Sequence, residues 1–316
     1  EMAVPKAAEI EVTAIIVSFN TLELTSRAVE TLLANAGNVT LQVIVWDNAS
    51  HDGSADVIAA RFPDVEVVHH DANLGFAVAN NRASERALGE YVVLVNSDTE
   101  TRPHAIENLL RFARAHPGAG IVGGRTLFAD GRLNPGSCWN AMTPWSLLCG
   151  AIGLSAAFPG SPLFNPEGIG GWKRDTVREV DIVSGCFLMA RTDLWRELGG
   201  FSSKLFMYGE DNDLCIRARR LGHRPMITPD AEIVHLGSAS AVTREIKLVQ
   251  LMRCKATIIR DHWSPPLQPL GLALLWLWTA NRRLATMIKR KAGMPSPRAD
   301  AFKGLWEKRQ DWLAGY

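Results

Sequence analysis

The chain has 316 residues, a formal net charge of +1, 47% hydrophobic residues and 21% charged residues. This length exceeds one small domain and allows a large α/β core with an appendage. The composition is ordinary for a folded protein, and the balanced charge gives no reason to expect nucleic acid as a partner.

The cysteines and the first residues indicate the compartment in which the protein works. Five cysteines are scattered along the chain and never form a C-x-x-C pair: Cys138, Cys149, Cys186, Cys215 and Cys254. This pattern predicts reduced thiols in the cytosol rather than a disulfide framework or a zinc site. Residues 1–11 carry charges and have no apolar stretch, so we expect no signal peptide there.

The first half of the chain alternates short apolar runs with segments of helical spacing. We expect strands over residues 12–18, 42–46, 65–69 and 91–95, and helices over 22–36, 53–61 and 76–88. Continuous Val, Ile and Leu runs between helices predict a mainly parallel sheet covered by helices on both faces. In such a sheet, ligands bind beyond the carboxyl ends of the strands.

The second half is less regular. Residues 131–174 are rich in Gly, Pro and Trp, and we expect an irregular binding loop there. Ordered structure is expected again over 180–190, followed by a helix over 211–221, a strand ending at 233–235, and a long helix over 243–262.

Polar loops follow each of the first four expected strands. Their candidate binding residues are Ser18, Asn20, Asp47, Asn48, Ser50, Asp52, Asn73, Gly75, Phe76, Asn80, Asn96, Ser97 and Asp98. Turns favour Asn, Asp and Ser in any protein, but four such loops at one edge of one sheet indicate a functional site. No G-x-G-x-x-G follows the first strand, which disfavours a dinucleotide-dependent oxidoreductase. The first loop also lacks the glycines and basic residues with which a nucleotidyltransferase holds a triphosphate.

The order of these motifs resembles glycosyltransferase family 2. The segments SFN, DNASHD, NLGFAVANN and NSDT are followed by SGC at 184–186, GEDNDL at 209–214 and HLGS at 235–238. The resemblance covers about residues 12–240 and implies the GT-A fold. It divides the chain into a catalytic domain over 1–240, with a nucleotide-binding half (12–125) and an acceptor half (126–240), and a C-terminal helical extension over 241–316.

The resemblance also implies an activity. The pattern is most similar to rhamnosyltransferases that use a deoxythymidine-diphosphate (dTDP) sugar, so we expect transfer from a dTDP- or UDP-linked donor to a hydroxyl of a glycan or polyprenyl-linked glycan. A UDP-hexose-dependent transferase and a catalytically inactive nucleotide-sugar-binding scaffold are the alternatives. The substitution of Asn96 for the first acid of the family's D-x-D motif favours the scaffold, whereas the acids that remain favour the enzyme.

Several nucleotide contacts follow from the resemblance. Asp47 matches the acid that accepts the N3–H of a pyrimidine base, since a carboxylate only accepts hydrogen bonds. Asp52 serves either the base and ribose or the cap of the helix near Gly53. Asn73, Gly75 and Asn80 match the segment along the nucleotide. The remaining matched group, Ser184, Gly185 and Cys186, is expected under the donor sugar or acceptor, with Cys186 as a packing residue rather than a nucleophile.

The resemblance implies a divalent cation, Mg²⁺ or Mn²⁺, beside the diphosphate. Asp98 and His235 are the expected ligands, and the imidazole would suit Mn²⁺ better than Mg²⁺. Because Asn96 is neutral, cation binding is expected to be weaker and more dependent on bound nucleotide. The alternatives are that Asn96 and Asp98 cap the helix after Pro103 and that His235 is a structural residue.

Glu210, Asp211 and Asp213 form an acidic cluster at the start of an expected helix. Favourable charge at a helix N-terminus explains one or two of these acids, but three repel one another and raise at least one pKa. By family position, Asp211 is the base that takes the acceptor proton during a direct displacement, which inverts the anomeric centre. Either Glu210 or Asp213 would orient the acceptor.

The C-terminal part changes character over residues 264–292. An apolar run, LGLALLWLW at 270–278, precedes Arg282, Arg283 and three basic residues at 289–291 without an intervening acid. The run is too short to span a bilayer and suits a helix in the interface of an anionic leaflet. Packing on the catalytic domain and a homodimer contact are the alternatives. With the reduced cysteines, this predicts a cytoplasmic protein at the inner face of the cell membrane.

Overall fold

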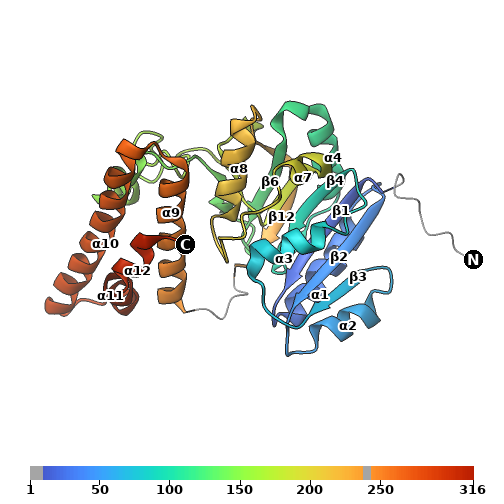
Figure 1. The fold of residues 1–316 in the computed structure, drawn as a ribbon, viewed down its shortest axis with the longest axis horizontal. Coiled ribbons are helices and arrows are strands. Elements are labelled where there is room, and N and C mark those ends of the chain that lie inside the picture. The colour runs from blue at the N-terminus through green and yellow to red at the C-terminus, as the bar shows by residue number, and fades with distance from the viewer. Residues whose placement is uncertain (1–9, 238–242) are drawn as a thin grey trace, which may run out of the picture. The chain divides into compact units, whose positions relative to one another are not determined.

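The computed structural model describes residues 10–237 and 243–316 (Figure 1). It divides into two compact units, one formed by residues 1–139 and 173–240 and the other by residues 140–172 and 241–316. Ser238, the last residue of the HLGS motif, lies outside the described residues, as does the expected domain boundary at 240.

The first unit is built on a ten-stranded mixed sheet within the described residues, with the path β3-β2-β1-β4-β11-β6-β12-β5. The path strands are β1 (Val12–Ser18), β2 (Leu41–Asn48), β3 (Glu66–His70), β4 (Tyr91–Val95), β5 (Thr99–Thr101), β6 (Ile121–Leu127), β11 (Phe187–Arg191) and β12 (Met226–His235). β7 (Leu133–Asn134) pairs with β6, and β9 (Arg178–Glu179) pairs with β12. The strands β8 (Cys138–Trp139) and β10 (Ile182–Val183) form a separate small sheet.

The first four long strands run parallel, as expected, but the sheet is mixed. β1 pairs in parallel with β2 and β4, and β2 pairs in parallel with β3. β11 is inserted antiparallel between β4 and β6, and β5 pairs antiparallel with β12. The expected α/β class with a helix-covered sheet is therefore confirmed.

Helices cover both faces of this sheet (Figure 1). They are α1 (Leu22–Asn35), α2 (Ser54–Arg61), α3 (Gly75–Ser84), α4 (Ala105–Ala115), α7 (Thr192–Glu197) and α8 (Glu210–Arg220). One face is sealed by α1 and α4, whose Leu32 and Leu109 join Ile16 in a single buried cluster. α3 packs on β1 and β2. Burial of both faces explains why the strands read as uninterrupted apolar runs.

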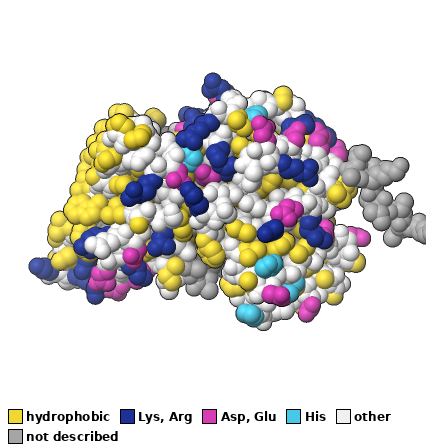
Figure 2. Space-filling view, viewed as in Figure 1, with side chains coloured by type: hydrophobic (Ala, Val, Ile, Leu, Met, Phe, Trp, Pro, Cys, Tyr) yellow, Lys and Arg dark blue, Asp and Glu magenta, His cyan; other side chains and the backbone are white. Residues whose placement is uncertain are grey.

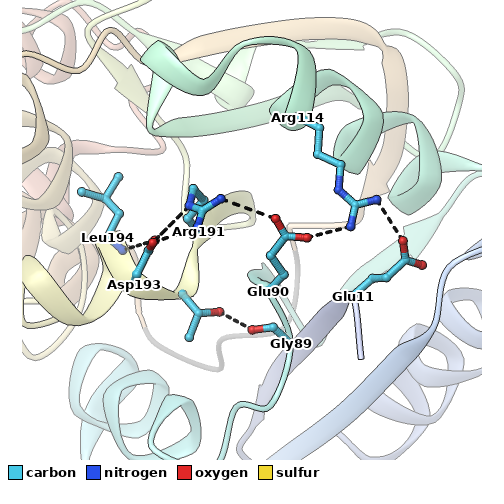
Figure 3. Close-up of polar contacts among 8 residues, drawn as sticks. Glu11, Gly89, Glu90, Arg114, Arg191, Asp193 and Leu194 are labelled. Carbon is cyan, nitrogen blue, oxygen red and sulfur yellow. Dashed lines mark hydrogen bonds and ion pairs between the residues drawn. The ribbon is translucent and has the colours of Figure 1, made fainter. Parts of the chain in front are cut away.

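Charged side chains fasten the edge of the sheet opposite the carboxyl ends of its parallel strands (Figure 3). Arg114 of α4 donates to Glu11 before β1 over 2.9 Å and to Glu90 before β4 over 2.7 Å. Arg191, at the end of β11, pairs with the same Glu90 and with Asp193. These groups are partly exposed, so each pair contributes at most about 1 kcal/mol. The charges of this edge are thus paired within the chain.

The second unit is helical within its described residues. Its members are α5 (Pro144–Ala151), α6 (Leu154–Ala157), α9 (Arg244–His262), α10 (Gln268–Lys291), α11 (Ala299–Glu307) and α12 (Arg309–Ala314). Trp312, Leu305 and Leu275 lie in its buried core. No helix in the described part of the chain is long and apolar enough to cross a membrane.

The expectation of an irregular loop over 131–174 is wrong for its central part. Residues 144–157 form α5 and α6, and α5 begins with a capping box in which Thr143 and Ser146 exchange side-chain and backbone hydrogen bonds. Pro144 occupies the first turn, where a missing N–H costs nothing. The Gly, Pro and Trp content of this segment favoured a loop, although the sequence contains the start signals of a helix.

Candidate active site

The strand pairing brings the sequence motifs to one edge of the sheet. Ser18 is in register with Asp47, and Asp47 with His69, so the ends of β1, β2 and β3 coincide. β11 begins where β4 ends, because Phe187 pairs with Val95. The segment 184–186 therefore lies beside Asn96, whose N–H donates to the Cys186 carbonyl over 3.2 Å.

Asp47 is fully buried, and only one of its two carboxylate oxygens accepts hydrogen bonds from the described residues. Its Oδ2 accepts hydrogen bonds from the Ser50 N–H over 3.2 Å and from His69 Nδ1 over 2.8 Å. Its Oδ1 accepts none from the described residues. A buried acceptor without a donor is costly, so the site is suited to a ligand that presents an N–H there. His69 was not among the expected residues, since only its cross-strand register with Asp47 reveals it.

The loops after β1 and β2 hold each other. The Asn20 N–H donates to Ser50 Oγ over 2.9 Å, and the His51 N–H donates to Asn20 Oδ1 over 2.7 Å. Asn20 has a positive φ of 52°, a conformation that Asn tolerates better than most residues. Ser18 is buried and shares hydrogen bonds with Thr21 and Thr25. These contacts make the two loops a single rigid border of the site.

Asp52 makes the contacts of a helix cap. Its Oδ2 accepts the Leu22 N–H at the start of α1 over 2.9 Å, and its Oδ1 accepts the N–H and hydroxyl of Ser54 at the start of α2. Burial alone would raise the pKa of Asp52, but these hydrogen bonds outweigh it and lower the pKa. Of the two expected roles, the structure displays capping; contact with a base or ribose stays a prediction.

Asn48 connects the loops after β2 and β3. Its Nδ2 donates to Asn73 Oδ1 over 2.8 Å, and its Oδ1 accepts the Leu74 N–H over 2.9 Å. Gly75 follows with a φ of +76°, and an added Cβ would lie 2.5 Å from the Phe206 carbonyl oxygen. Only glycine fits this close approach. Asn48 and Asn73 therefore position the loop.

Residues of α3 hold the loop before α8. The Phe76 N–H donates to the Phe206 carbonyl over 3.0 Å. Asn81 exchanges two hydrogen bonds of 2.8 Å with the backbone of Phe201, whereas Asn80 is buried and donates to the Phe76 carbonyl. Of these two asparagines, Asn81 is the one that ties the nucleotide half to the acceptor half of the expected catalytic domain.

The segment after β4 faces the end of β12. Pairing of His235 with Thr99 places the imidazole beside Asp98, with His235 Nε2 at 3.2 Å from Asp98 Oδ1. The buried Oδ1 of Asn96 accepts no hydrogen bond from the described chain. α4 has no side-chain cap, so the alternative that Asn96 and Asp98 cap that helix is not supported. Ser97 lies between them in the turn.

The two titratable groups of this segment shift each other's pKa. Burial would raise the pKa of Asp98, but the His235 hydrogen bond outweighs it and lowers the pKa. Burial would lower the pKa of His235, but hydrogen bonds with Asp98 and Cys186 raise it to about 10. Cys186 is buried against this histidine, a contact between distant segments that the sequence did not reveal.

The donor atoms of this segment are of the kind that hard divalent cations select. One carboxylate, one amide oxygen and one imidazole fit Mg²⁺ or Mn²⁺. The described residues contain no group of three or more His, Cys, Asp or Glu side chains that could hold a metal ion. A cation here would therefore need further oxygens, such as those of a diphosphate.

The acidic cluster at the start of α8 is divided between two tasks. Asp213 forms an ion pair with Arg217 over 2.7 Å, and Arg217 also donates to the Gly200 carbonyl. Asp211 instead accepts the Gly185 N–H over 3.1 Å at Oδ2. Glu210 Oε2 is buried and accepts no hydrogen bond from the described residues. Glu210 and Asp211 are thus the two acids of this cluster that are available to act on a substrate.

Burial is the main reason why these two acids are perturbed. It raises the pKa of Asp211 and of Glu210, and for Glu210 the neighbouring Asp211 charge raises the pKa further. The sequence attributed the shift to crowding of three acids, but Asp213 is neutralised by Arg217. A carboxylate with a raised pKa is a better proton acceptor.

Gly185 packs beside Asp211. An added Cβ there would lie 3.5 Å from the Phe76 ring and 3.9 Å from Asp211 Cβ, which are ordinary contacts. Ser184 is fixed by its N–H, which donates to the Ser137 carbonyl over 2.9 Å. Trp139 donates to Asn212 Oδ1 over 3.0 Å and was not among the expected residues, because it lies in the segment that the sequence left irregular.

Comparison with known proteins decides the family. The profile of Glycosyl transferase family 2 matches residues 13–196, which is more than half of the chain. The chain belongs to glycosyltransferase family 2. The resemblance drawn from the motifs is therefore confirmed, and the protein is a glycosyltransferase.

Two relatives carry names that concern sugar transfer and O-antigen biosynthesis. An N-acetylglucosaminyl-diphospho-decaprenol L-rhamnosyltransferase of Mycobacterium tuberculosis is 30% identical over 211 residues, which cover 62% of this chain and 66% of that relative. The match thus spans slightly less than two thirds of the relative's length. The O-antigen biosynthesis protein RfbC of Myxococcus xanthus is 26% identical over 227 residues, covering 69% of this chain and 16% of RfbC.

Solved structures of other glycosyltransferases share the fold. The mannosyltransferase PcManGT from Pyrobaculum calidifontis, in complex with GDP-Man and Mn²⁺, aligns with a TM-score of 0.56 and 21% identity over 99% of this chain and 86% of its own. TarS 1–349 of S. aureus aligns with a TM-score of 0.53 and 14% identity over 96% and 92%. The expected GT-A fold is confirmed.

Proposed function

We propose that this family 2 enzyme is a metal-dependent, inverting rhamnosyltransferase that uses dTDP-rhamnose. The observation that carries the proposal is a set of three buried acceptor atoms, Asp47 Oδ1, Asn96 Oδ1 and Glu210 Oε2, that receive no hydrogen bond from the described chain. Asp47 and Asn96 lie at strand ends that pairing brings to one edge of the sheet, and Glu210 begins α8, whose Asp211 accepts the Gly185 N–H. Buried acceptors in this state suit a ligand carrying an N–H, a cation and a hydroxyl.

Asp47 binds the base of the donor nucleotide. Its Oδ2 is held by Ser50 and His69, so Oδ1 is free to accept the N3–H of thymine or uracil. Both bases present this group, and the choice of dTDP rests on the likeness to the mycobacterial rhamnosyltransferase. A UDP-hexose remains the alternative donor.

Asp98, His235 and Asn96 would hold the divalent cation together with diphosphate oxygens. When bound, the cation would neutralise the charge that develops on the leaving diphosphate. The pairing of Asp98 with His235 keeps the carboxylate ionised, because it lowers the pKa of Asp98. The same contact raises the pKa of His235 to about 10, so a cation that uses the imidazole would have to displace its proton.

Asp211 acts as the base. Its hydrogen bond with the Gly185 N–H fixes the position of the carboxylate. It takes the proton of the acceptor hydroxyl as that oxygen attacks the anomeric carbon from the side opposite the diphosphate. One bond forms as the other breaks, so the configuration inverts and no enzyme nucleophile is required. Glu210 is placed to orient the acceptor.

The acceptor class follows from the same relative, whose name specifies a diphospho-decaprenol-linked sugar. We propose a polyprenyl-linked or related envelope glycan as acceptor, used at the cytoplasmic face of the membrane. A scaffold that binds nucleotide sugars without transferring them is the competing function.

Ligand-induced stabilisation and transfer by Asp211→Asn test the proposal. A ligand at 100 times its Kd adds about 2.7 kcal/mol of stability, so dTDP-rhamnose with Mn²⁺ should raise the unfolding midpoint more than UDP- or GDP-linked sugars do. Asp211→Asn should keep this shift and lose transfer. A larger shift with UDP-sugars would overturn the rhamnose assignment, and an active Asp211→Asn enzyme would overturn the base.

A further inference from the structure

α10 is apolar on two sides. Its inner side packs in the core of the helical unit, where Leu274 and Leu275 are buried beside Phe302. The Arg282 guanidinium lies over the Trp278 ring, and this ring is edge-on to Phe302. Asn281 donates to the Ala151 carbonyl of α5 over 3.0 Å. The apolar run that the sequence assigned either to the protein or to a membrane is therefore partly used by the protein.

A second apolar stripe runs along the opposite side of the same helix. We call it the outer face, and its members are Leu270, Ala273, Leu277, Ala280, Leu284, Met287 and Ile288. Their spacing of three and four residues places them on one side of an α-helix. Leu284 is 54% exposed and Ile288 is 58% exposed, whereas Leu277 and Ala280 are half-buried.

The helical unit exposes other apolar side chains besides those of the outer face. Ile152 is 53% exposed and follows Ala151, to which α10 is hydrogen-bonded. Figure 2 shows hydrophobic side chains gathered along the edge of the unit that α10 forms. An apolar surface of this extent in a folded protein marks an interaction site.

The charges on α10 have a single sign. The helix contains no Asp or Glu, and its last three residues are Lys289, Arg290 and Lys291. Arg290 pairs with Asp300 over 2.8 Å, while Lys289 and Lys291 are exposed. A second copy of this helix would bring like charges together without an acid to balance them. An anionic lipid headgroup balances them directly.

We propose that the outer face of α10 docks this protein on the surface of an anionic phospholipid bilayer. The helix lies in the plane of the interface, with the outer face in the acyl-chain boundary and the basic C-terminal turn among the headgroups. The helix does not cross the bilayer, because its other side is buried in protein. This inference uses only the helical unit and does not depend on the identity of the donor sugar.

Vesicle sedimentation of the intact protein tests the docking surface. Wild-type protein should bind phosphatidylcholine vesicles that contain phosphatidylglycerol, more strongly than pure phosphatidylcholine, with binding that weakens as salt is added. Leu284→Ser with Ile288→Ser should lower the partition coefficient at least about tenfold on either vesicle. The matched control is Leu88→Ser with Leu221→Ser, which changes similarly exposed leucines in the other unit.

A second pair of variants tests the electrostatic part. Lys289→Gln with Lys291→Gln should weaken binding to anionic vesicles roughly 30-fold, at about fivefold per lysine, and hardly affect binding to neutral ones. Arg102→Gln with Arg111→Gln removes the same net charge from the other unit and should bind like wild type. If the leucine–isoleucine variant does not fold by circular dichroism, the lysine pair decides alone.

Three results would overturn the proposal. The proposal fails if wild-type protein does not bind anionic vesicles. It also fails if the outer-face variants bind as strongly as the wild type. A wild-type dimer in light scattering that becomes monomeric in Leu284→Ser with Ile288→Ser would show that a second copy covers the outer face. Because no nucleotide is present in these assays, their failure is distinguishable from failure of the proposed transferase function.

Discussion

Replacing Asp47 with Asn should invert the base preference of the nucleotide site. In the wild type, Oδ2 is held by two donors, Ser50 and His69, and the buried Oδ1 has none. In Asp47→Asn, the amide oxygen must stay with those two donors, so the NH₂ group takes the place of Oδ1. A donor would then face the N3–H of thymine or uracil, where an acceptor stood before.

The size of the effect follows from the bond that is lost. A hydrogen bond to a charged group contributes about 1.5–3 kcal/mol, so the Kd for dTDP should rise roughly 10- to 150-fold. Cytosine differs because its N3 accepts a hydrogen bond. The variant should therefore bind CDP at least as well as the wild type does, which reverses the order of the two nucleotides.

Isothermal titration of both proteins with dTDP and CDP, in the presence of Mn²⁺, measures this change. The control Asp56→Asn removes one exposed charge from α2 nearby and should leave both Kd values unchanged. Equal weakening of dTDP and CDP would mean that the substitution damages the loop rather than the base contact. Unchanged dTDP binding would refute the assignment of Asp47.

Other perturbations follow from the packing and charge of the site. Gly185→Ala should keep the free energy of unfolding within about 0.5 kcal/mol in urea titrations, because its Cβ would meet the Phe76, Phe201 and Asp211 side chains at 3.5–3.9 Å, which are ordinary contacts. Gly75→Ala should instead lower the free energy of unfolding by about 1–3 kcal/mol in urea titrations, since φ at this residue is +76° and an added Cβ would be too close to Phe206. Equal stability of the two variants would contradict this prediction. Burial raises the folded-state pKa of Glu210 above its unfolded value, so the stability of the wild type falls as pH rises through the folded pKa. Glu210→Gln should therefore be more stable than wild type near pH 9 and equally stable near pH 4. A difference in thermal unfolding that does not change with pH would refute the raised pKa. Asn96→Asp should tighten Mn²⁺ binding roughly tenfold in titrations with dTDP bound, because it adds a carboxylate oxygen, and weaker binding would place Asn96 outside the cation site.

The parallel half of the sheet was predictable because its signals are local. β1 and β4 have the bounds expected from their apolar runs, since both faces of these strands are buried and most of their residues are apolar. The loops that follow them carry the site for the same reason. A residue directly after a buried parallel strand lies at one edge of the sheet wherever the strand sits in the order.

The antiparallel half depends on contacts between distant segments, and the sequence does not display them. β11 is inserted between β4 and β6 although about 60 residues separate it from β6 along the chain. This insertion places Gly185 beside Asp211, and the pairing of β12 with β5 brings His235 to Asp98; together they complete the site. His69 went unpredicted for a related reason, since its function follows only from its strand register.

The cross-bracing of the loops has a consequence for engineering. Asn20 holds the loop of Ser50, Asn48 holds the loop of Asn73, and Asn81 holds the backbone of Phe201, so each of these segments is held by a side chain of another one. A single loop grafted from a relative that uses another sugar donor would lack the asparagine contact that holds it. The unit of exchange is the whole set of loops with their asparagines, and donor preference in this scaffold should be transplantable only as that set.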